Sequence, residues 1–516
     1  MITIAARLYT STLSRILLLS GCVLALNTQA QEPTPDRMIR TAYYPVQVNY
    51  HDGLIPRSDT QAGGAIDKLG DHYIGVTGAG AFYRIIPGSG DTGMTAEKMD
   101  LPTPHNPAEF DADAQPLVIR AFFRVIDIVS RPTASGWQLF ASHHHWLPDS
   151  KCLVMRVSML ELDKNLARVN NNKPWQVIYQ TTPCLTLKEG NRGRILAGHE
   201  SGGRMGWLAS GKLLFTVGDL EHDGWYQPGD LSQRDDASYG KVIEIDADKR
   251  EGIIYSKGHR NPQGLYIDSA GTIWESEHGP RGGDEINIVV RGKNYGWPRV
   301  TYGTDYGRYN WPPATSPTGD HGDYEQPVFA FVPSIGTSNL IRLEGSQFEH
   351  WNGNLLLAGL ASRTLYRISL HDNRVVYSEP LAVERRIRDI AIGPDHQIWL
   401  WGETGELIEL SVADVQGKGA QLFQICAGCH TTGVSSGGLG PSLIGIVGRE
   451  MASRTDYNYS DAFQQLDGEW NEELLDRFLQ DPNAFVPGTT MNELKLDDAE
   501  DRKAIIEYLR DSVYTY

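Results

Sequence analysis

The sequence predicts an all-β six-bladed β-propeller followed by a small all-α domain. Between residues 63 and 411, short segments of alternating apolar residues recur between turns rich in Gly, Asp and Asn, which is typical of β-strands. Six such units follow one another, and radial repetition of strands indicates a propeller. From residue 416 to 516 the apolar spacing becomes that of amphipathic helices. A pair of β-sandwiches is the alternative for the strand-rich part.

Each predicted blade contains a strand, a turn with Gly or Asp, a second strand, another turn and a third strand. The units lie at 71–85, 136–160, 211–246, 271–292, 353–370 and 396–410. Residues 31–62 are polar and lack a clear period, so they are predicted to form an N-terminal arm that precedes the propeller.

The charge balance excludes one class of partner. The chain has 516 residues, with 47 Lys and Arg against 64 Asp and Glu, a net charge of −17. Such an acidic chain argues against a nucleic-acid partner and favours solubility. No apolar run reaches the ~20 residues of a transmembrane helix.

The first 30 residues have the pattern of a signal peptide. Arg7 and Arg15 form a basic region, residues 16–26 are apolar, and small residues before position 31 offer a cleavage site. We therefore expect export to the bacterial periplasm or secretion. Residues 19–22 (LSGC) also resemble a lipoprotein box, so a lipid anchor on Cys22 is the alternative.

The remaining four cysteines fall into two pairs. Cys426-x-x-Cys429-His430 is the attachment signature of a c-type haem and predicts one covalent haem. Cys152 and Cys184 are predicted to form a disulfide, because an exported protein meets oxidising conditions. Two buried free thiols are the alternative.

The haem segment resembles class I cytochrome c along its length. The stretches that carry this resemblance are GLGPSLIGIVGRE (438–450) and FLQDPNAFVPGTTM (478–491). The resemblance implies that His430 and Met491 bind the haem iron and that the carbonyl of Pro441 orients His430. His/Met ligation fills both axial positions and favours electron transfer. A methionine that only fills the core is the alternative for Met491.

The propeller segment resembles the soluble quinoprotein glucose and aldose sugar dehydrogenases, which use pyrroloquinoline quinone (PQQ) and calcium. The motifs are residues 256–298, GHESGGRMGW (198–207) and RRIRDIAIGPDHQIW (385–399). The resemblance is good over 190–411 and poor over 63–190.

This resemblance implies roles for particular residues. His199 is the expected base, since imidazole titrates near neutral pH. Carbonyl oxygens suit calcium, and guanidinium groups suit the cofactor's carboxylates. The implied cofactor contacts are Arg260, Asn261, Arg386 and Arg388, and the implied calcium carbonyls at PQQ are those of Gly279 and Pro280.

A second calcium is also implied, with side-chain ligands Glu285 and Asp305 and backbone oxygens of Tyr295 and Thr301. An acidic surface loop is the alternative for this region.

Four departures from the family pattern stand out. Gly198 replaces an acidic residue before the expected base, and Ala361 replaces a cofactor lysine, although Arg363 is close. The Gln-containing block that contacts sugar in blade two is absent, and FFRVIDIV (122–129) stands in its place. The run 143–145 (HHH) is predicted to form a polar funnel edge rather than a metal site.

Together these motifs predict an exported quinohaemoprotein dehydrogenase. It would oxidise a sugar or related alcohol with PQQ and pass electrons through its own haem to an external acceptor, such as a soluble cytochrome or a respiratory component. The alternative is a propeller without quinone that serves as a docking module for the cytochrome.

Overall fold

The computed structural model describes residues 37–56, 62–88, 93–114, 122–169, 174–187, 191, 198–413, 418–432, 439–491 and 494–511. The predicted signal peptide and Cys22 lie outside these residues. The described part of the chain contains no helix that is long and apolar enough to cross a membrane.

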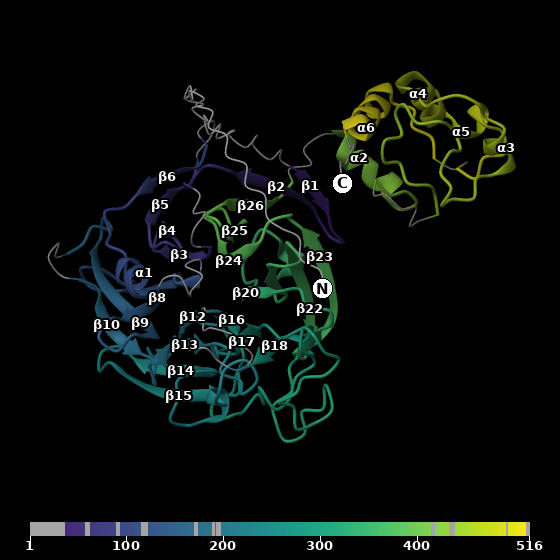
Figure 1. The fold of residues 1–516 in the computed structure, drawn as a ribbon. Coiled ribbons are helices and arrows are strands. Elements are labelled where there is room, and N and C mark those ends of the chain that lie inside the picture. The colour runs from purple at the N-terminus through teal and green to yellow at the C-terminus, as the bar shows by residue number, and fades with distance from the viewer. Residues whose placement is uncertain are drawn as a thin grey trace, which may run out of the picture. The chain divides into compact units, whose positions relative to one another are not determined.

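The strands form six sheets arranged radially, which confirms the propeller (Figure 1). Each sheet is antiparallel, and the first strands of neighbouring blades lie next to one another around the ring. Blade one contains β3 (Gly64–Leu69), β4 (His72–Thr77), β5 (Phe82–Ile86) and β6 (Thr95–Lys98). Blade two contains β7 (Val125–Pro132), β8 (Gly136–Leu147), β9 (Cys152–Asp163), β10 (Gln176–Gln180) and the short β11 (Leu185–Thr186).

The next three blades have four strands each. Blade three contains β12 (Gly202–Trp207), β13 (Leu213–Val217), β14 (Lys241–Asp246) and β15 (Glu251–Lys257). Blade four contains β16 (Pro262–Ile267), β17 (Ile273–Glu277), β18 (Asp284–Ile288) and β19 (Phe329–Phe331). Blade five contains β20 (Thr337–Arg342), β21 (Leu355–Gly359), β22 (Thr364–His371) and β23 (Arg374–Ala382). Helix α1 (Pro107–Ala114) lies between blades one and two in the chain.

The sixth blade closes the ring with strands from both ends of the propeller. It contains β24 (Ile387–Ile392), β25 (Ile398–Gly402) and β26 (Leu407–Val412), followed in space by β2 (Pro45–His51) and β1 (Arg37–Arg40). Strand β2 pairs antiparallel with β26, and its alternate residues Val46, Val48 and Tyr50 are buried. This pairing covers an otherwise open edge of the last blade. It corrects the prediction that all of residues 31–62 form an arm that precedes the propeller.

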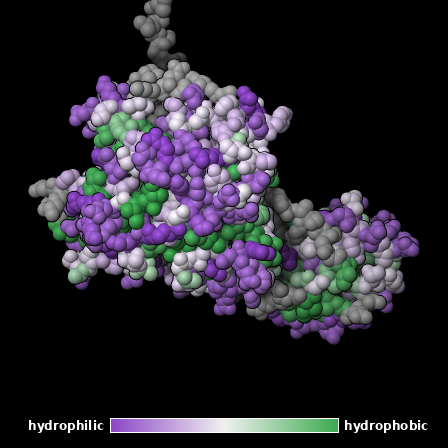
Figure 2. Space-filling model, turned by 90° about the horizontal axis from the view of Figure 1, so that it is seen from below, coloured by the Kyte–Doolittle hydropathy of each residue, from purple (hydrophilic) through white to green (hydrophobic). Residues whose placement is uncertain are grey.

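Polar side chains cover most of the surface in the view of Figure 2, with smaller apolar areas between them. The apolar residues gather between the blades instead. Trp399 and Trp401 of blade six, for example, are fully buried in one cluster with Tyr73 and Ile85 of blade one.

The C-terminal domain is helical, as predicted. Its helices are α2 (Lys418–Ala427), α3 (Asp461–Gln464), α4 (Glu472–Gln480), α5 (Pro482–Phe485) and α6 (Ala499–Asp511). Helices α2 and α6 pack together, with the rings of Phe423 and Tyr508 5.1 Å apart. Polar side chains begin the helices: the carboxylate of Asp498 accepts hydrogen bonds from the backbone N–H of Glu500 and Asp501.

Cys152 and Cys184 form a disulfide, which confirms the predicted pairing. Their Cα atoms are 5.7 Å apart and their sequence separation is 32. Cys152 begins β9 and Cys184 precedes β11, so the bond secures the segment that carries β11 to the middle of blade two.

Replacing both cysteines by alanine should lower the free energy of unfolding by about 3 kcal/mol, because the unfolded chain regains the entropy of an open loop of this length. Urea denaturation followed by tryptophan fluorescence measures the change. An unchanged midpoint, or two titratable thiols in denatured, unreduced wild type, would contradict this role.

Candidate functional site

The predicted cofactor residues of blades three, four and six gather at one end of the inner strands. His199 lies before β12, and Arg260 and Asn261 come directly before β16. Arg386 precedes β24, and Arg388 is its second residue. Because the inner strands start at the same end of the ring, the fold brings these residues from three blades to one region.

Arg260 is the best-connected of them. It is 4% exposed, its guanidinium forms an ion pair with Glu200, and Nη1 donates to the carbonyls of His278 (3.1 Å) and Gly279 (2.8 Å). Burial opposes its charge, but the nearby carboxylates raise the pKa of Arg260 above its ordinary value. Asn261 is also buried, and its side-chain oxygen accepts from the backbone N–H of Gly202 at 3.1 Å.

His199 lies beside this cluster. Its imidazole is half-buried and its ring centroid is 3.8 Å from that of Phe122. Glu200, the next residue, has φ 56°, a backbone conformation that is uncommon for residues other than glycine.

Two carboxylates that sequence reasoning missed complete the cluster. Burial and the charge of Glu200 raise the pKa of Asp219 well above its ordinary value and that of Asp223 to about 7. Trp297 donates to Asp219 at 2.6 Å. The signal was available in GDLEHD (218–223), an acidic segment directly after a buried strand.

Arg386 and Arg388 do point to one side, as predicted, and there they share one carboxylate, Glu403. Burial raises the pKa of Glu403, but the charges and hydrogen bonds of the two arginines prevail and lower it. Nε of Arg388 is buried and has no hydrogen-bond partner among the described residues. One edge of this guanidinium is therefore open to a further acceptor.

The Gly279–Pro280 turn is held rigidly. A Cβ on Gly279 would lie 2.3 Å from the carbonyl oxygens of Gly282 and Gly283, so only glycine fits. Its N–H donates to Asp284 at 3.1 Å, and Asp284 also accepts from the N–H of Gly336 at 2.6 Å. The carbonyl of Gly279 bonds to Arg260, which places the predicted calcium carbonyl directly beside a cation of the chain.

Three of the four residues predicted for the second calcium line one small cavity: Glu285, Tyr295 and Thr301, together with Glu277. Asp305 instead accepts hydrogen bonds from Trp225 (3.1 Å), Tyr226 (2.5 Å) and Gly307 (3.1 Å). The alternative of an acidic surface loop is wrong, because Glu285 and Asp305 are only 8% and 4% exposed.

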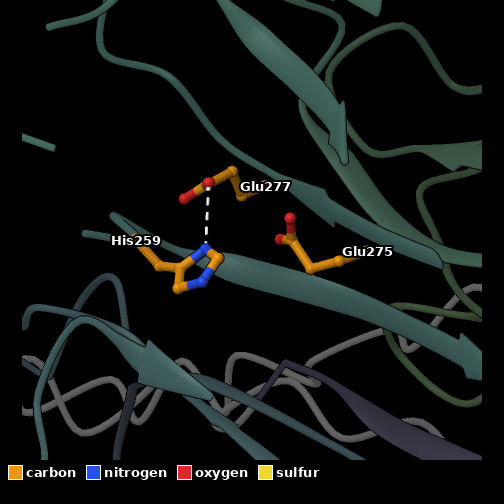
Figure 3. A group of neighbouring side chains, drawn as sticks. All are labelled: His259, Glu275 and Glu277. Atoms are coloured by element: carbon orange, nitrogen blue, oxygen red, sulfur yellow. Dashed lines mark hydrogen bonds and ion pairs between the residues drawn. The ribbon is translucent and has the colours of Figure 1, made fainter. Parts of the chain in front are cut away.

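A second acidic group lies next to this cavity. His259, Glu275 and Glu277 are buried, and one potential ligand atom from each lies within 4.8 Å of the others (Figure 3). Asn287 donates to Glu275 at 2.9 Å and to Glu277 at 3.2 Å. Burial and the charge of Glu277 raise the pKa of both Glu275 and Glu285 well above the usual carboxyl value.

This acidic group includes oxygen atoms that accept no hydrogen bond from the described residues. Oε1 of Glu275 and Oδ1 of Asn287 are buried with no hydrogen-bond partner among the described residues. Oxygen atoms that lack donors suit a hard cation such as calcium. The sequence signal was the Glu-x-Glu of WESEHG (274–279), since alternate strand residues share a face.

The histidine run of blade two is not an exposed funnel edge. His143 and His144 are fully buried in β8, and burial lowers their pKa values to about 4 and about 3. His143 contacts the hydroxyl of Ser158 at 2.9 Å, and His144 contacts the backbone of Arg124 at 3.3 Å. These side chains are neutral and lie in the core. His144 is also close to Gly198, because a Cβ added to that glycine would lie 3.4 Å from Nε2 of His144.

Position 361, where the family pattern has a cofactor lysine, carries no basic side chain in this chain. Ala361 is exposed and its N–H donates to the carbonyl of Ile335 at 3.1 Å. Arg363 is exposed in a turn with φ 53°.

The helical domain contains a cavity built for a planar apolar group. Cys426, Cys429, His430 and Met491 all line it, together with apolar side chains such as Ile446 and Phe478. Nδ1 of His430 lies 2.8 Å from the carbonyl of Pro441, which fixes the ring as predicted. A Cβ on Gly440 would lie 2.4 Å from the same ring, so glycine is required there. The two cysteines, the histidine and the methionine therefore meet around one space, and they fit a haem.

Comparison with known proteins supports both the propeller and the cytochrome c domain. The family model for glucose/sorbosone dehydrogenase matches residues 126–409, and that for cytochrome c matches residues 417–512. Aldose sugar dehydrogenase YliI of Escherichia coli is 32% identical over 236 residues, which are 42% of this chain and 62% of that protein, short of two thirds of its length.

Two further relatives extend the comparison. Quinoprotein glucose dehydrogenase B of Acinetobacter calcoaceticus is 36% identical over 113 residues, 17% of this chain and 24% of that protein. A solved glucose dehydrogenase structure superimposes with a TM-score of 0.54 at 26% identity, covering 70% of this chain and all of that one. The chain thus belongs to the glucose/sorbosone dehydrogenase family and carries a class I cytochrome c domain after its propeller.

Proposed function

We propose that this chain is an exported quinohaemoprotein dehydrogenase that oxidises a sugar or related alcohol with PQQ and passes the electrons through its own haem. One observation carries the proposal: His199, Arg260 and Arg388, from three different blades, converge at one end of the ring, in a chain whose helical domain has a cavity lined by Cys426, Cys429, His430 and Met491.

The groups around this end suit PQQ. Buried Nε atoms of Arg260 and Arg388 have no hydrogen-bond partner among the described residues, and guanidinium groups bind carboxylates with directional hydrogen bonds. PQQ, when bound, supplies a carbonyl system that accepts two electrons from the substrate carbon.

His199 takes the proton of the substrate hydroxyl. A neutral imidazole is required for this step, and the ring of Phe122 fixes one side of it. Glu200, the next residue in the chain, pairs with Arg260 and so ties the segment of His199 to the cofactor residues.

A bound haem would supply one-electron chemistry, so each substrate oxidation would need two successive transfers. Cys426 and Cys429 would hold the haem covalently, and the imidazole of His430 and the thioether of Met491 would bind its iron, a ligand pair that suits electron transfer. The final acceptor is an external redox partner such as a soluble cytochrome or a respiratory component.

Calcium is the proposed cation of the acidic cavities. The carbonyls of Gly279 and Pro280 would hold one ion at PQQ, and Glu285 with the backbone oxygens of Tyr295 and Thr301 would hold a second. Export is part of the same proposal, with the periplasm or the exterior as destination and a lipid anchor on Cys22 as the alternative.

Adding PQQ and calcium to the haem-loaded protein should make haem reduction dependent on an aldose or alcohol. His199→Ala should slow this reduction by about 10²–10⁴-fold, the usual contribution of a general base, while PQQ binding is unchanged. Stopped-flow absorbance of the reduced haem measures the rate.

His371→Ala is the matched control, because His371 is an exposed histidine of blade five. Equal rates for His199→Ala and wild type would show that His199 is structural. If wild type neither binds PQQ nor reduces its haem with any aldose or alcohol, the docking-module function replaces this one.

Met491→Ala should abolish the long-wavelength absorbance band of a methionine bound to ferric iron and lower the reduction potential, because the soft thioether stabilises ferrous iron. Met451→Leu, a substitution elsewhere in the same core, should leave both unchanged. Retention of the band in Met491→Ala would exclude Met491 as ligand.

Calcium should raise the thermal midpoint of the propeller, since a ligand at 100 times its Kd adds about 2.7 kcal/mol of stability. Glu285→Gln should remove most of this rise, whereas Glu251→Gln, at an exposed position of β15, should retain it. Calorimetry with calcium and with a chelator measures the thermal midpoint. A wild-type midpoint that the chelator does not change would refute the second calcium site.

A further inference from the structure

A small cavity on the axis of the propeller is lined by arginines, two of which have a buried N–H group without a hydrogen-bond acceptor among the described residues. Five inner strands, or the residue directly before one, contribute to its lining, and three of the lining residues are arginines. The lining residues are Gly63, Gly64, Arg124, Ile126, Gly202, Arg204, Gln263 and Arg388.

Two of these arginines have carboxylate partners. Arg204 forms ion pairs with Asp127 at 2.8 Å and Asp389 at 3.1 Å. Arg388 shares Glu403 with Arg386. The positive charge of these two groups is thus at least partly neutralised inside the protein.

Arg124 differs from both. It is 5% exposed, and its Nη1 donates to the backbone carbonyl of Ala62 at 3.0 Å, a neutral partner. Its Nε is buried without a hydrogen-bond partner among the described residues, as is Nε of Arg388 on the same cavity. Burial and the charge of Arg388 lower the pKa of Arg124 to about 9. A buried N–H group without an acceptor is costly, so Arg124 and Arg388 both have a place for a further hydrogen-bond acceptor.

We propose that Arg124, together with the open edge of Arg388, binds a carboxylate group of a molecule held at the active end of the propeller. This inference rests on the proposed function and adds a binding residue to it. The planar N–H edges of two guanidinium groups match the geometry of a carboxylate.

The cavity is directly linked to the predicted cofactor contacts. Gln263 accepts from Nη1 of Arg388 at 3.2 Å and donates to Asn261 at 3.2 Å. Arg124 also lies in the segment 122–129 that replaces the family's sugar-contacting block. The carboxylate therefore comes either from PQQ or from an acidic sugar such as a uronic acid.

The test compares Arg124→Met with Arg131→Met in the full-length, haem-loaded protein. Arg131 lies near the other end of β7, where it binds Gln138 and Asp248, and serves as the matched control. Three quantities are measured. The first is the Kd of PQQ, by equilibrium dialysis with calcium; the others are the thermal shift and the haem-reduction rate that glucuronate gives, each compared with glucose.

A lost charge-assisted hydrogen bond corresponds to about 10–100-fold weaker binding. A weaker Kd for PQQ in Arg124→Met alone assigns the site to the cofactor. A selective loss of the response to glucuronate, with PQQ affinity intact, assigns it to the substrate. Unchanged values in both arms, or equal losses in Arg131→Met, would overturn the proposal.

Arg124→Lys covers the case in which Arg124→Met does not fold. It keeps the charge but loses the planar fork, so the same ligand should bind several-fold more weakly in a protein of wild-type stability. Wild-type affinity in this variant would also overturn the proposal. If wild type binds no PQQ, the proposed function fails, while the glucuronate thermal shift still tests the carboxylate site.

Discussion

The propeller depends on a buried charge network centred on Arg204. From blade three, Arg204 binds Asp127 of blade two and Asp389 of blade six, and its Nε donates to the carbonyl of Gln263 in blade four. Asp389 in turn accepts from the N–H of Ile66 in blade one and from Asn339 of blade five. All six blades are thus tied at the axis. A buried charge left unpaired costs several kcal/mol, so an arrangement of the blades that separates Arg204 from its carboxylates is disfavoured.

This network also positions the residues at the end of the ring where His199, Arg260 and Arg386 lie. Once the inner strands are fixed in register, the residues directly before them converge, and His199, Arg260 and Arg386 need no further contacts to be brought near one another. The strand pairing of β2 with β26 closes the same ring at its outer part. The reactive groups therefore lie on short segments anchored to rigid strands, which suits precise positioning.

Local patterns in the sequence were sufficient for most of the fold. Alternation of apolar residues predicts the blades, and the spacing of Cys426, Cys429 and His430 predicts the haem cavity because those residues are neighbours in the chain. Strand β2 was missed because its partner lies some 360 residues away and a seven-residue strand carries little periodic signal. Glu403 was missed because its importance comes from burial and from its pairing with Arg386 and Arg388, which its own place in the sequence does not reveal. Glu275 was missed although the Glu-x-Glu spacing pointed to it, because the spacing alone does not show that the strand is buried.

The end of the ring shared by His199, Arg260 and Arg388 combines two buried groups of charges, joined by Asn261 and Gln263. In the first group, the carboxylate of Glu200 pairs with Arg260, and burial beside Glu200 raises the pKa of Asp219 and Asp223. In the second group, Arg204 pairs with Asp127 and Asp389, Arg388 pairs with Glu403, and Nη1 of Arg124 donates to the backbone carbonyl of Ala62. The buried Nε atoms of Arg260, Arg124 and Arg388 have no hydrogen-bond partner among the described residues. Both groups therefore keep N–H groups for a further acceptor, because the internal carboxylates do not use all the donors of the guanidinium groups.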